Sequence, residues 1–373
     1  MTLDRLRRLA VSQTLFPLTT LKRALHKLAY VQADPIRAPA RAQDLMLRHR
    51  VTGYRAGDLE RRYTQLGVEE DFFLNYGFVT KALQALMHPR PDLCVPAIGP
   101  SPWSKEQRQR VQLLMEFVRE RGPVHPREVD AHFAHGKVRN YWGGQSSATT
   151  QLLDTMHYSG MLRVVRRESG VRVYATQHHG PEPENEAERH ARMDALCDAV
   201  IRLHAPLPER SLRFFLRRLR FCAPQWAAEI AGTIGRAKAR LEHARVDGVD
   251  WYWPPRGTSP RDAEDDAVRL LSPFDPVVHD RDRFELLWGW AYRFEAYTPA
   301  PKRKLGYYAL PLLWRDRVIG WGNLSMKDGE LQSEIGFVKS KPRDRVFRRE
   351  LEAELERIRL FFIPAAAAVQ LKK

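Results

Sequence analysis

The sequence predicts an α+β fold with three tandem winged helix-turn-helix motifs, followed by a small antiparallel β-barrel and a C-terminal helix. Residues 105–175 show the order helix, helix, helix, hairpin that is typical of a winged helix. The same order returns less clearly on either side of this stretch. Beyond residue 259, short β-rich runs precede one last helix. We therefore divide the chain into four consecutive segments, which are 1–100, 101–180, 185–258 and 259–373.

The second segment has the clearest helical pattern. Apolar residues recur at helical spacing from residue 105 until Gly122, which ends the first helix together with the proline after it. A second helix begins near Pro126, since proline is favoured in a first helical turn. After a glycine-rich turn, Ser146 or Ser147 caps a third helix.

The hairpin of this segment is predicted from two alternating runs, 162–166 and 171–174, which flank Ser169 and Gly170. Small polar groups at the start of a recognition helix and cations on a wing suit contacts to phosphates or base edges. The expected DNA contacts of this segment are Ser146, Ser147, Thr149, Arg163 and Arg166.

The first segment carries three helical stretches, at 3–9, 20–30 and 39–50. Thr19 or Thr20 suits the cap of the second stretch, and Pro39 suits the first turn of the third. These stretches predict the first winged helix.

The third segment opens helices near residues 211 and 224 and ends in a hairpin whose turn is Asp247-Gly248. Its helices are strongly basic, and we expect DNA contacts from Arg213 and Arg217. The alternative is a solvated helix face without a partner.

The fourth segment contains short β-rich runs at 294–297, 307–313, 318–321 and 335–338, separated by turns. A final helix follows at 344–362. This pattern predicts a small antiparallel β-barrel or sheet with a terminal helix.

The charge of the chain indicates a polyanionic partner. Lys and Arg number 61 against 45 Asp and Glu, which leaves a formal net charge of +16, and most of the basic residues are arginine. Arginine matches phosphate with a fixed fork of donors, so nucleic acid is the expected partner. Genome composition is the alternative source of part of this excess.

Composition and motifs exclude several other classes. Three cysteines, far apart, indicate neither a disulfide framework nor a thiolate metal site. No signal peptide or membrane-spanning stretch is evident, so we expect a cytoplasmic, nucleoid-associated protein. No phosphate-binding loop, dinucleotide fingerprint or hydrolase motif occurs, and we expect neither a cofactor nor a metal.

The first candidate site is the tetrapeptide Gln32-Ala33-Asp34-Pro35. Because Pro35 disfavours a helical Asp34, the stretch should be extended, so that Gln32 and Asp34 project to the same side. An amide beside a carboxylate can orient water and stabilise a developing sugar cation. The alternative is an Asp-Pro turn with a surface Gln.

The second candidate site is the basic stretch 302–308, whose cations precede a glycine and two tyrosines. Such a strand or hairpin suits a nucleic-acid groove, with contacts from Lys302, Arg303, Lys304 and Tyr307. The alternative is a charged loop that leads into a half-buried strand.

Two clusters permit a metal site but favour other roles. His132 and His135 have helical spacing but no further ligand nearby in sequence, which favours surface histidines. The carboxylates around Asp275 and Asp280 can bind a divalent cation, or can hold Arg281 and Arg283 and cap the turn into the next helix, which we prefer.

Together these patterns resemble the AlkZ/YcaQ family of winged-helix DNA glycosylases, over essentially the whole chain. The similarity lies in YVQADPI at 30–36, in LSPFDP at 271–276, and in YRFE at 292–295 leading to KR at 302–303 and GYY at 306–308. The family signature is Gln, an aliphatic residue, then Gln or Asp. Gln32 and Asp34 match its Gln-x-Asp branch, while Ala33 is smaller than the usual Ile or Leu.

This resemblance implies a cradle for duplex DNA, excision of N7-alkylated purines and unhooking of interstrand crosslinks. Asp34 would supply charge or accept the water proton, and Gln32 would position the water. Bulky lesions would be handled without full extrusion of the nucleotide. Since no lysine is placed as a Schiff-base nucleophile, we expect a monofunctional glycosylase.

The expected partner is alkylated or crosslinked duplex DNA, bound by a monomer without an obligate protein partner. Because winged helices are more often binders than enzymes, one alternative function is a non-enzymatic regulator or architectural DNA binder. Another is a damage sensor that has lost catalysis.

Overall fold

The computed structural model describes residues 1–90, 94–95, 99–100, 104–133, 136–139, 145–255, 265–328 and 330–362. The chain divides into two compact units. One comprises Met1–Arg61, Asp198–Phe214 and Ala237–Lys373, and the other comprises Arg62–Cys197 and Phe215–Arg236. Each unit combines stretches that are distant in sequence, so neither coincides with one of the four consecutive segments, whose division stays a prediction.

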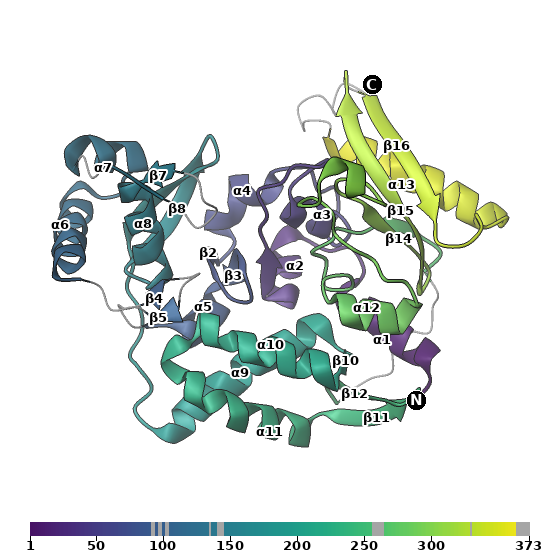
Figure 1. Cartoon of the computed structure of the whole chain (residues 1–373), viewed down its shortest axis with the longest axis horizontal. Coiled ribbons are helices and arrows are strands. Elements are labelled where there is room, and N and C mark those ends of the chain that lie inside the picture. The colour runs from purple at the N-terminus through teal and green to yellow at the C-terminus, as the bar shows by residue number, and fades with distance from the viewer. Residues whose placement is uncertain are drawn as a thin grey trace. The chain divides into compact units, whose positions relative to one another are not determined.

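The first unit is a mixed α+β structure (Figure 1). Its elements are α1 (Leu3–Thr14), α2 (Leu21–Leu28), β1 (Tyr30–Gln32), α3 (Ala42–Leu47), α4 (Asp58–Arg62, which ends one residue beyond the unit), β10 (Leu207–Pro208), β11 (Glu242–Val246), β12 (Val249–Trp253), β13 (Val268–Leu270), α12 (Arg281–Trp288), the short 3-10 helix η3 (Ala300–Lys302), β14 (Leu310–Trp314), β15 (Arg317–Lys327), β16 (Glu330–Phe337) and α13 (Arg345–Phe362).

The largest sheet of this unit has the antiparallel order β13-β14-β15-β16. Strands β15 and β16 approach closely at a glycine pair, because a Cβ at Gly320 would lie 2.1 Å from the Gly336 carbonyl oxygen. In the described part of the chain this sheet has β13 and β16 at its two edges, so the antiparallel β-barrel or sheet predicted for this region is present as an open, half-barrel sheet. The long helix α13 is the predicted C-terminal helix, and it packs against β13.

One predicted strand of this region is wrong. Residues 294–297 form turns instead of pairing with the sheet, because the Glu295 side chain bonds to the backbone of a later loop and prolines follow at 299 and 301. The basic stretch at 302–308 is a loop that leads into β14, as in the alternative stated above.

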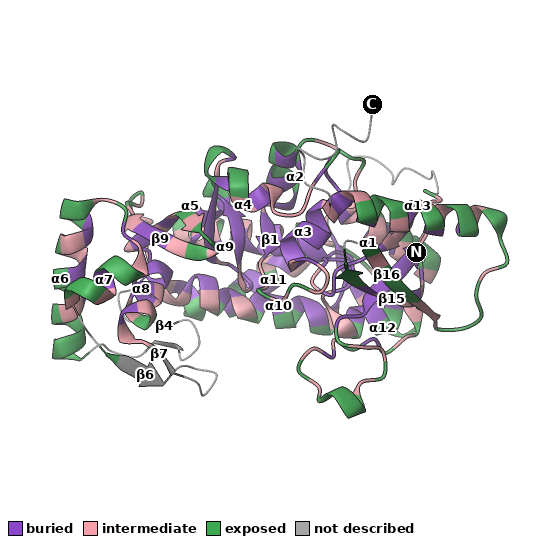
Figure 2. Cartoon of the chain, turned by 90° about the horizontal axis from the view of Figure 1, so that it is seen from above, coloured by how far each residue is buried: buried purple, intermediate pink, exposed green. Residues whose placement is uncertain are grey.

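The N-terminal helices follow the sequence closely. Thr20 caps α2 by accepting a hydrogen bond from the Arg23 amide, and Ala29 ends it in a left-handed conformation before β1. α3 begins at Ala42, so Pro39 precedes the helix and does not lie in its first turn. In Figure 2 the colours along α2 separate a buried face from an exposed face.

The second unit contains the predicted succession of three helices and a hairpin, α6, α7, α8, β8 and β9. Its elements are η1 (Tyr63–Gln65), β2 (Val68–Phe72), β3 (Tyr76–Thr80), α5 (Lys81–Met87), β4 (Cys94–Val95), β5 (Gly99–Pro100), α6 (Lys105–Arg121), α7 (Pro126–Phe133), β6 (Lys137–Arg139), β7 (Gln145–Ser147), α8 (Ala148–Tyr158), β8 (Leu162–Glu168), β9 (Val171–Thr176) and η2 (Pro224–Glu229). The three helices and the hairpin enclose one apolar core that includes Leu114, Leu153 and Val164.

Three helices run from one unit into the other along the chain: α9 (Glu186–His204), α10 (Glu209–Cys222) and α11 (Ile230–Arg240). The hairpin β11–β12 turns at Asp247 and Gly248, both with positive φ, which confirms the predicted turn. Among the described residues, no helix is long and apolar enough to cross a membrane.

Candidate functional site

The candidate catalytic segment begins where β1 ends. Gln32 is the last residue of β1 and is only 8% exposed, so it is not the surface glutamine of the alternative interpretation. Asp34 is half-buried, and its Oδ1 accepts a hydrogen bond of 2.9 Å from the Ile36 amide across Pro35. That bond orients the carboxylate locally, as in an Asx turn.

The backbone of Asp34 is held by a polar chain from α3 and α4. The Asp34 amide donates to Gln43 Oε1 at 3.4 Å, and Gln43 Nε2 donates to Glu60 Oε1 at 3.1 Å. Glu60 also pairs with Arg41. Gln43 is buried, so this chain ties the position of Asp34 to the interior of the unit.

The charge of Asp34 acts on two tyrosines, Tyr297 and Tyr308. Burial raises the pKa of Asp34 above its ordinary value, and the hydrogen bond from Ile36 opposes that shift. Burial, and then the negative charge of Asp34, raise the pKa values of Tyr297 and Tyr308. Because charges act strongly only over short distances, these three side chains belong to one site.

An aromatic cluster forms the apolar part of this site. The Phe294 ring makes edge contacts with three rings, with centroid distances of 5.3 Å to Phe274, 5.2 Å to Tyr308 and 6.0 Å to Tyr297. Tyr308 is buried, whereas Tyr297 is 72% exposed. The cluster therefore presents one largely exposed ring beside a half-buried carboxylate.

The loop that carries Tyr297 is closed at its base by Glu295. The Glu295 carboxylate is 8% exposed and accepts hydrogen bonds from the amides of Lys304, at 2.9 and 3.0 Å, and Leu305, at 2.7 Å. Burial acts to raise the pKa of Glu295, but these bonds outweigh it and lower the pKa. We call residues 296–303, which lie between these anchors, the clasped loop.

The predicted contacts of the basic stretch lie in or beside the clasped loop. Lys302, Lys304 and Tyr307 are exposed. Arg303 is partly occupied, since its Nε donates to the Thr298 carbonyl at 2.8 Å and its guanidinium lies 4.9 Å from the Tyr307 ring centroid. Lys302 and Lys304 are thus the cations of this stretch that face solvent.

Two of the three DNA contacts predicted near the start of α8 are already engaged within the protein. Thr149 is fully buried, because it lies on the face of α8 that Leu153 and Met156 direct into the core, so it is not an exposed DNA contact. Ser147 caps α8 and donates to Asp130 at 2.7 Å. Ser146 pairs with Val138 in the short β6–β7 ladder.

The wing of this unit is largely neutralised by its own neighbours. Arg163 donates to Glu69 at 2.6 and 3.2 Å, and Arg166 pairs with Glu168. The adjacent Arg167 bonds to Glu70 in the same way as Arg163 bonds to Glu69. Much of the positive charge that we expected the wing to offer to DNA therefore forms ion pairs within the unit. Arg166 remains half-exposed despite its partner.

The two α10 arginines that we predicted as DNA contacts differ in whether a carboxylate neutralises them. Arg213 pairs with Glu209 at 2.8 Å, which also binds Lys238. Arg217 is exposed, and no ion pair to it is present among the described residues.

The carboxylates considered for a metal are occupied by protein groups. Asp275 binds Arg50 in a bidentate pair, with both side chains fully buried. Asp280 caps α12 through the Arg283 amide, as preferred above. Arg281 and Arg283 bond to backbone carbonyls, so the expectation that the carboxylates hold them is wrong.

Histidines also provide no metal cluster in the described chain. His132 stacks on Phe117, with ring centroids 4.6 Å apart, and His135 lies outside the described residues. No group of three potential ligands occurs anywhere among the residues that the structure describes.

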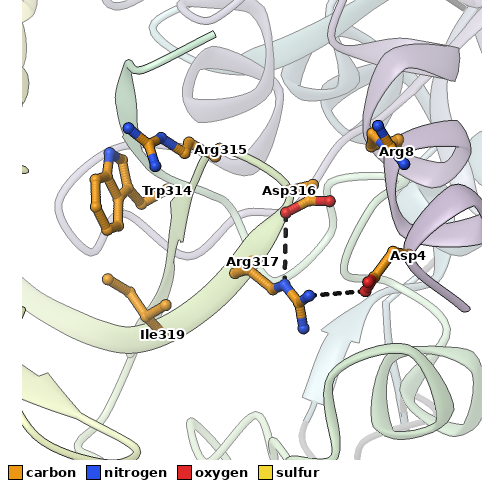
Figure 3. A pocket seen from close by; sticks show the side chains of 7 residues that line it. All are labelled: Asp4, Arg8, Trp314, Arg315, Asp316, Arg317 and Ile319. Carbon is orange, nitrogen blue, oxygen red and sulfur yellow. Dashed lines mark hydrogen bonds and ion pairs between the residues drawn. The ribbon is translucent and has the colours of Figure 1, made fainter. Parts of the chain in front are cut away.

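The pocket drawn in Figure 3 lies away from these residues. It has a volume of about 360 Å³ and is lined by Asp4, Arg8, Trp314, Arg315, Asp316, Arg317 and Ile319. Within it, Arg317 lies 2.7 Å from Asp4 and 3.5 Å from Asp316, and Arg315 pairs with Asp266 outside the lining. Its two carboxylates, Asp4 and Asp316, both lie against the Arg317 guanidinium, so we place the candidate site at Asp34.

Three residues of the site were not identified from the sequence: Gln43, Glu295 and Tyr297. Tyr297 lies in a run that alternates like a strand, which concealed its exposure. Glu295 and Gln43 act through backbone groups distant in sequence, and no local spacing signals such contacts.

Two comparisons relate the chain to known proteins. A family model described as DNA glycosylase AlkZ-like matches residues 25–361. The structure is similar to that of Streptomyces sahachiroi DNA glycosylase AlkZ, with a TM-score of 0.61 and 14% sequence identity, over 97% of this chain and 96% of that chain. At that identity the structural likeness shows a shared mixed α+β fold.

Proposed function

The chain belongs to the AlkZ-like family of DNA glycosylases, as its sequence predicted, and we propose that it excises N7-alkylated purines and unhooks interstrand crosslinks in duplex DNA. The observation that carries this proposal is the half-buried Asp34 carboxylate, oriented by Ile36 and placed beside an aromatic cluster. A general DNA-binding protein has no need of a carboxylate that burial destabilises.

The chemistry requires only modest help at the leaving group. An N7-alkylated purine already carries positive charge, so cleavage of the bond between N9 and C1′ neutralises the base as it departs. Asp34 stabilises the cation that develops on the sugar and accepts the proton of water as the water oxygen bonds to C1′. Gln32 positions that water. No lysine attacks C1′ in this scheme, so the product is an abasic site in an intact strand.

DNA binding in this proposal uses three winged helices, in segments 1–100, 101–180 and 185–258. The predicted DNA contacts whose positive charge remains accessible are the exposed Arg217, the half-exposed Arg166 and, in the fourth segment, the exposed Lys302 and Lys304. Asp34 is only partly buried, which suits a bulky or crosslinked base held at an open surface instead of one extruded into a deep pocket.

The test is incubation of the purified protein with duplex DNA that contains one N7-methylguanine, followed by chromatography of the released base. We expect free N7-methylguanine and an abasic strand that breaks only after alkali. A duplex crosslinked through N7 positions should separate into single strands on a denaturing gel. The proposal fails if wild-type protein releases no base.

The same experiment separates the alternative functions. A damage sensor would bind the lesion duplex more tightly than undamaged DNA without releasing base, and a regulator would prefer one operator sequence over both.

A further inference from the structure

The helix that precedes the candidate catalytic segment has an entirely basic exposed face. On α2, Lys22, Arg23, His26 and Lys27 are exposed, while Leu21, Ala24, Leu25 and Leu28 are buried. We call the four exposed side chains the α2 face. By contrast, the wing arginines Arg163 and Arg167 of the second segment bond to carboxylates.

No acidic residue neutralises the α2 face. Among the described residues, no ion pair joins any of its side chains to a carboxylate, and the first turn of the helix contains no acidic residue. The Lys27 ammonium lies 4.6 Å from the Phe16 ring centroid, which orients the cation without cancelling its charge.

This arrangement is unfavourable for the isolated helix. Lys22 and Arg23 lie near its N-terminus, where positive charge opposes the helix dipole. Arg23 and Lys27 are spaced i, i+4, so their charges repel each other. These charges destabilise the helix in the free protein, and no carboxylate of the described residues compensates them. Such an arrangement favours binding of an external anion.

We propose that the α2 face binds the phosphates of duplex DNA next to the damaged nucleotide and thereby sets the position of Asp34 along the strand. The partner is a polyanion with regularly spaced phosphates, because cations at i, i+1 and i+5 line one side of a helix. This inference rests on the proposed function, which supplies the duplex.

The chain limits how far these contacts lie from the reaction. Asp34 follows Lys27 by seven residues, which span at most roughly 25 Å. Since phosphates recur every ~3.4 Å along each strand, the α2 face contacts backbone within about seven nucleotides of the lesion.

The test is the salt dependence of binding. The triple variant Lys22→Gln, Arg23→Gln, Lys27→Gln should reduce the slope of log affinity against log salt by about 2.7, since each lost phosphate contact contributes ~0.9. At saturating protein, the single-turnover rate of base release should also fall, because the face that sets the position of Asp34 along the strand is lost.

A matched control removes the same charge elsewhere in the same unit. Lys339, Arg343 and Arg345 are also exposed without ion pairs among the described residues, and their triple replacement by Gln should reduce the slope by clearly less. A charge-conserving variant, Lys22→Arg with Lys27→Arg, should keep the wild-type slope and shows that the helix still folds.

Equal slopes for the two triple variants would overturn the inference, as would an unchanged slope in the α2 variant. These outcomes are distinct from failure of the proposed function. If the wild type releases no base, the slopes still report whether the α2 face contacts DNA.

Discussion

Arg50 and Asp275, which lie 225 residues apart in sequence, form a bidentate ion pair with N–O distances of 2.8 and 3.0 Å. Both side chains are completely buried. Arg50 also donates to the carbonyls of Thr14 and Met46, so one guanidinium joins α1, α3 and the LSPFDP block. This charge pair thus ties the LSPFDP block, one of the stretches that carry the family resemblance, to the N-terminal helices α1 and α3.

Removing one partner of this pair should destabilise the protein strongly. Asp275→Asn leaves the buried Arg50 charge uncompensated, and we expect it to lower the free energy of unfolding by about 3–5 kcal/mol. Urea denaturation followed by tryptophan fluorescence measures this loss. If Asp275 instead served as a metal ligand, EDTA would lower the Tm of the wild type, and we expect no such change.

Asp34→Asn should separate stability from catalysis. Base release should fall at least about 100-fold, since the variant keeps the shape of the side chain but loses its charge. DNA affinity should change by no more than a few-fold. Full excision by the variant would contradict the role of the carboxylate.

The pH dependence follows from the same carboxylate. The pKa of Asp34 in the folded protein is raised above the ordinary 3.8, so the folded state binds this proton more tightly than the unfolded state does. Its contribution to the free energy of unfolding therefore falls as pH rises from 3.8 through the folded pKa. Asp34→Asn removes this decline and should match or exceed the wild-type Tm at pH 7. Base release should be lost as pH falls through the folded pKa.

Glu295→Gln should loosen the clasped loop. The amide side chain lacks the charge that strengthens the bonds from the Lys304 and Leu305 amides, each of which we value at about 1.5–3 kcal/mol with the charged carboxylate. Limited trypsin digestion should then cut at Lys302 to Lys304 several-fold faster. The exposed Glu330→Gln serves as control and should leave cleavage there unchanged. Equal digestion of both variants would show that Glu295 does not hold the loop.

Tyr297→Ala should weaken excision through loss of a stacking surface. One base stacked on an aromatic ring contributes about 1–3 kcal/mol, so kcat/KM for N7-methylguanine duplex should fall roughly 5–150-fold. Tyr297→Phe keeps the ring and should stay within about twofold of the wild type. Leu286→Ala, at another exposed apolar side chain, is the matched control. Loss of activity in the Phe variant would assign the effect to the hydroxyl.

Local sequence signals predicted much of the secondary structure. Thr20 and Ser147 cap the helices that they were expected to cap, and Asp247-Gly248 makes the expected turn. Such features depend on a few adjacent residues whose backbone preferences are intrinsic, so they can be identified without tertiary context. The stretch around Gln32 and Asp34 was likewise recognisable because its chemistry lies within a tetrapeptide.

Only the tertiary structure decides which basic side chains pair with carboxylates and which stay exposed. The sequence alone determined an α+β chain with excess arginine and one distinctive Gln-x-Asp segment. Folding then directed Arg163 to Glu69 and Arg50 to Asp275, and left Lys22, Arg23 and Lys27 exposed. Folding also brings the Glu295 carboxylate to the Lys304 amide, which closes the clasped loop. It leaves Tyr297 exposed near Asp34. An ion pair depends on which distant carboxylate packs nearby, because charges interact through space, whereas composition counts every arginine alike.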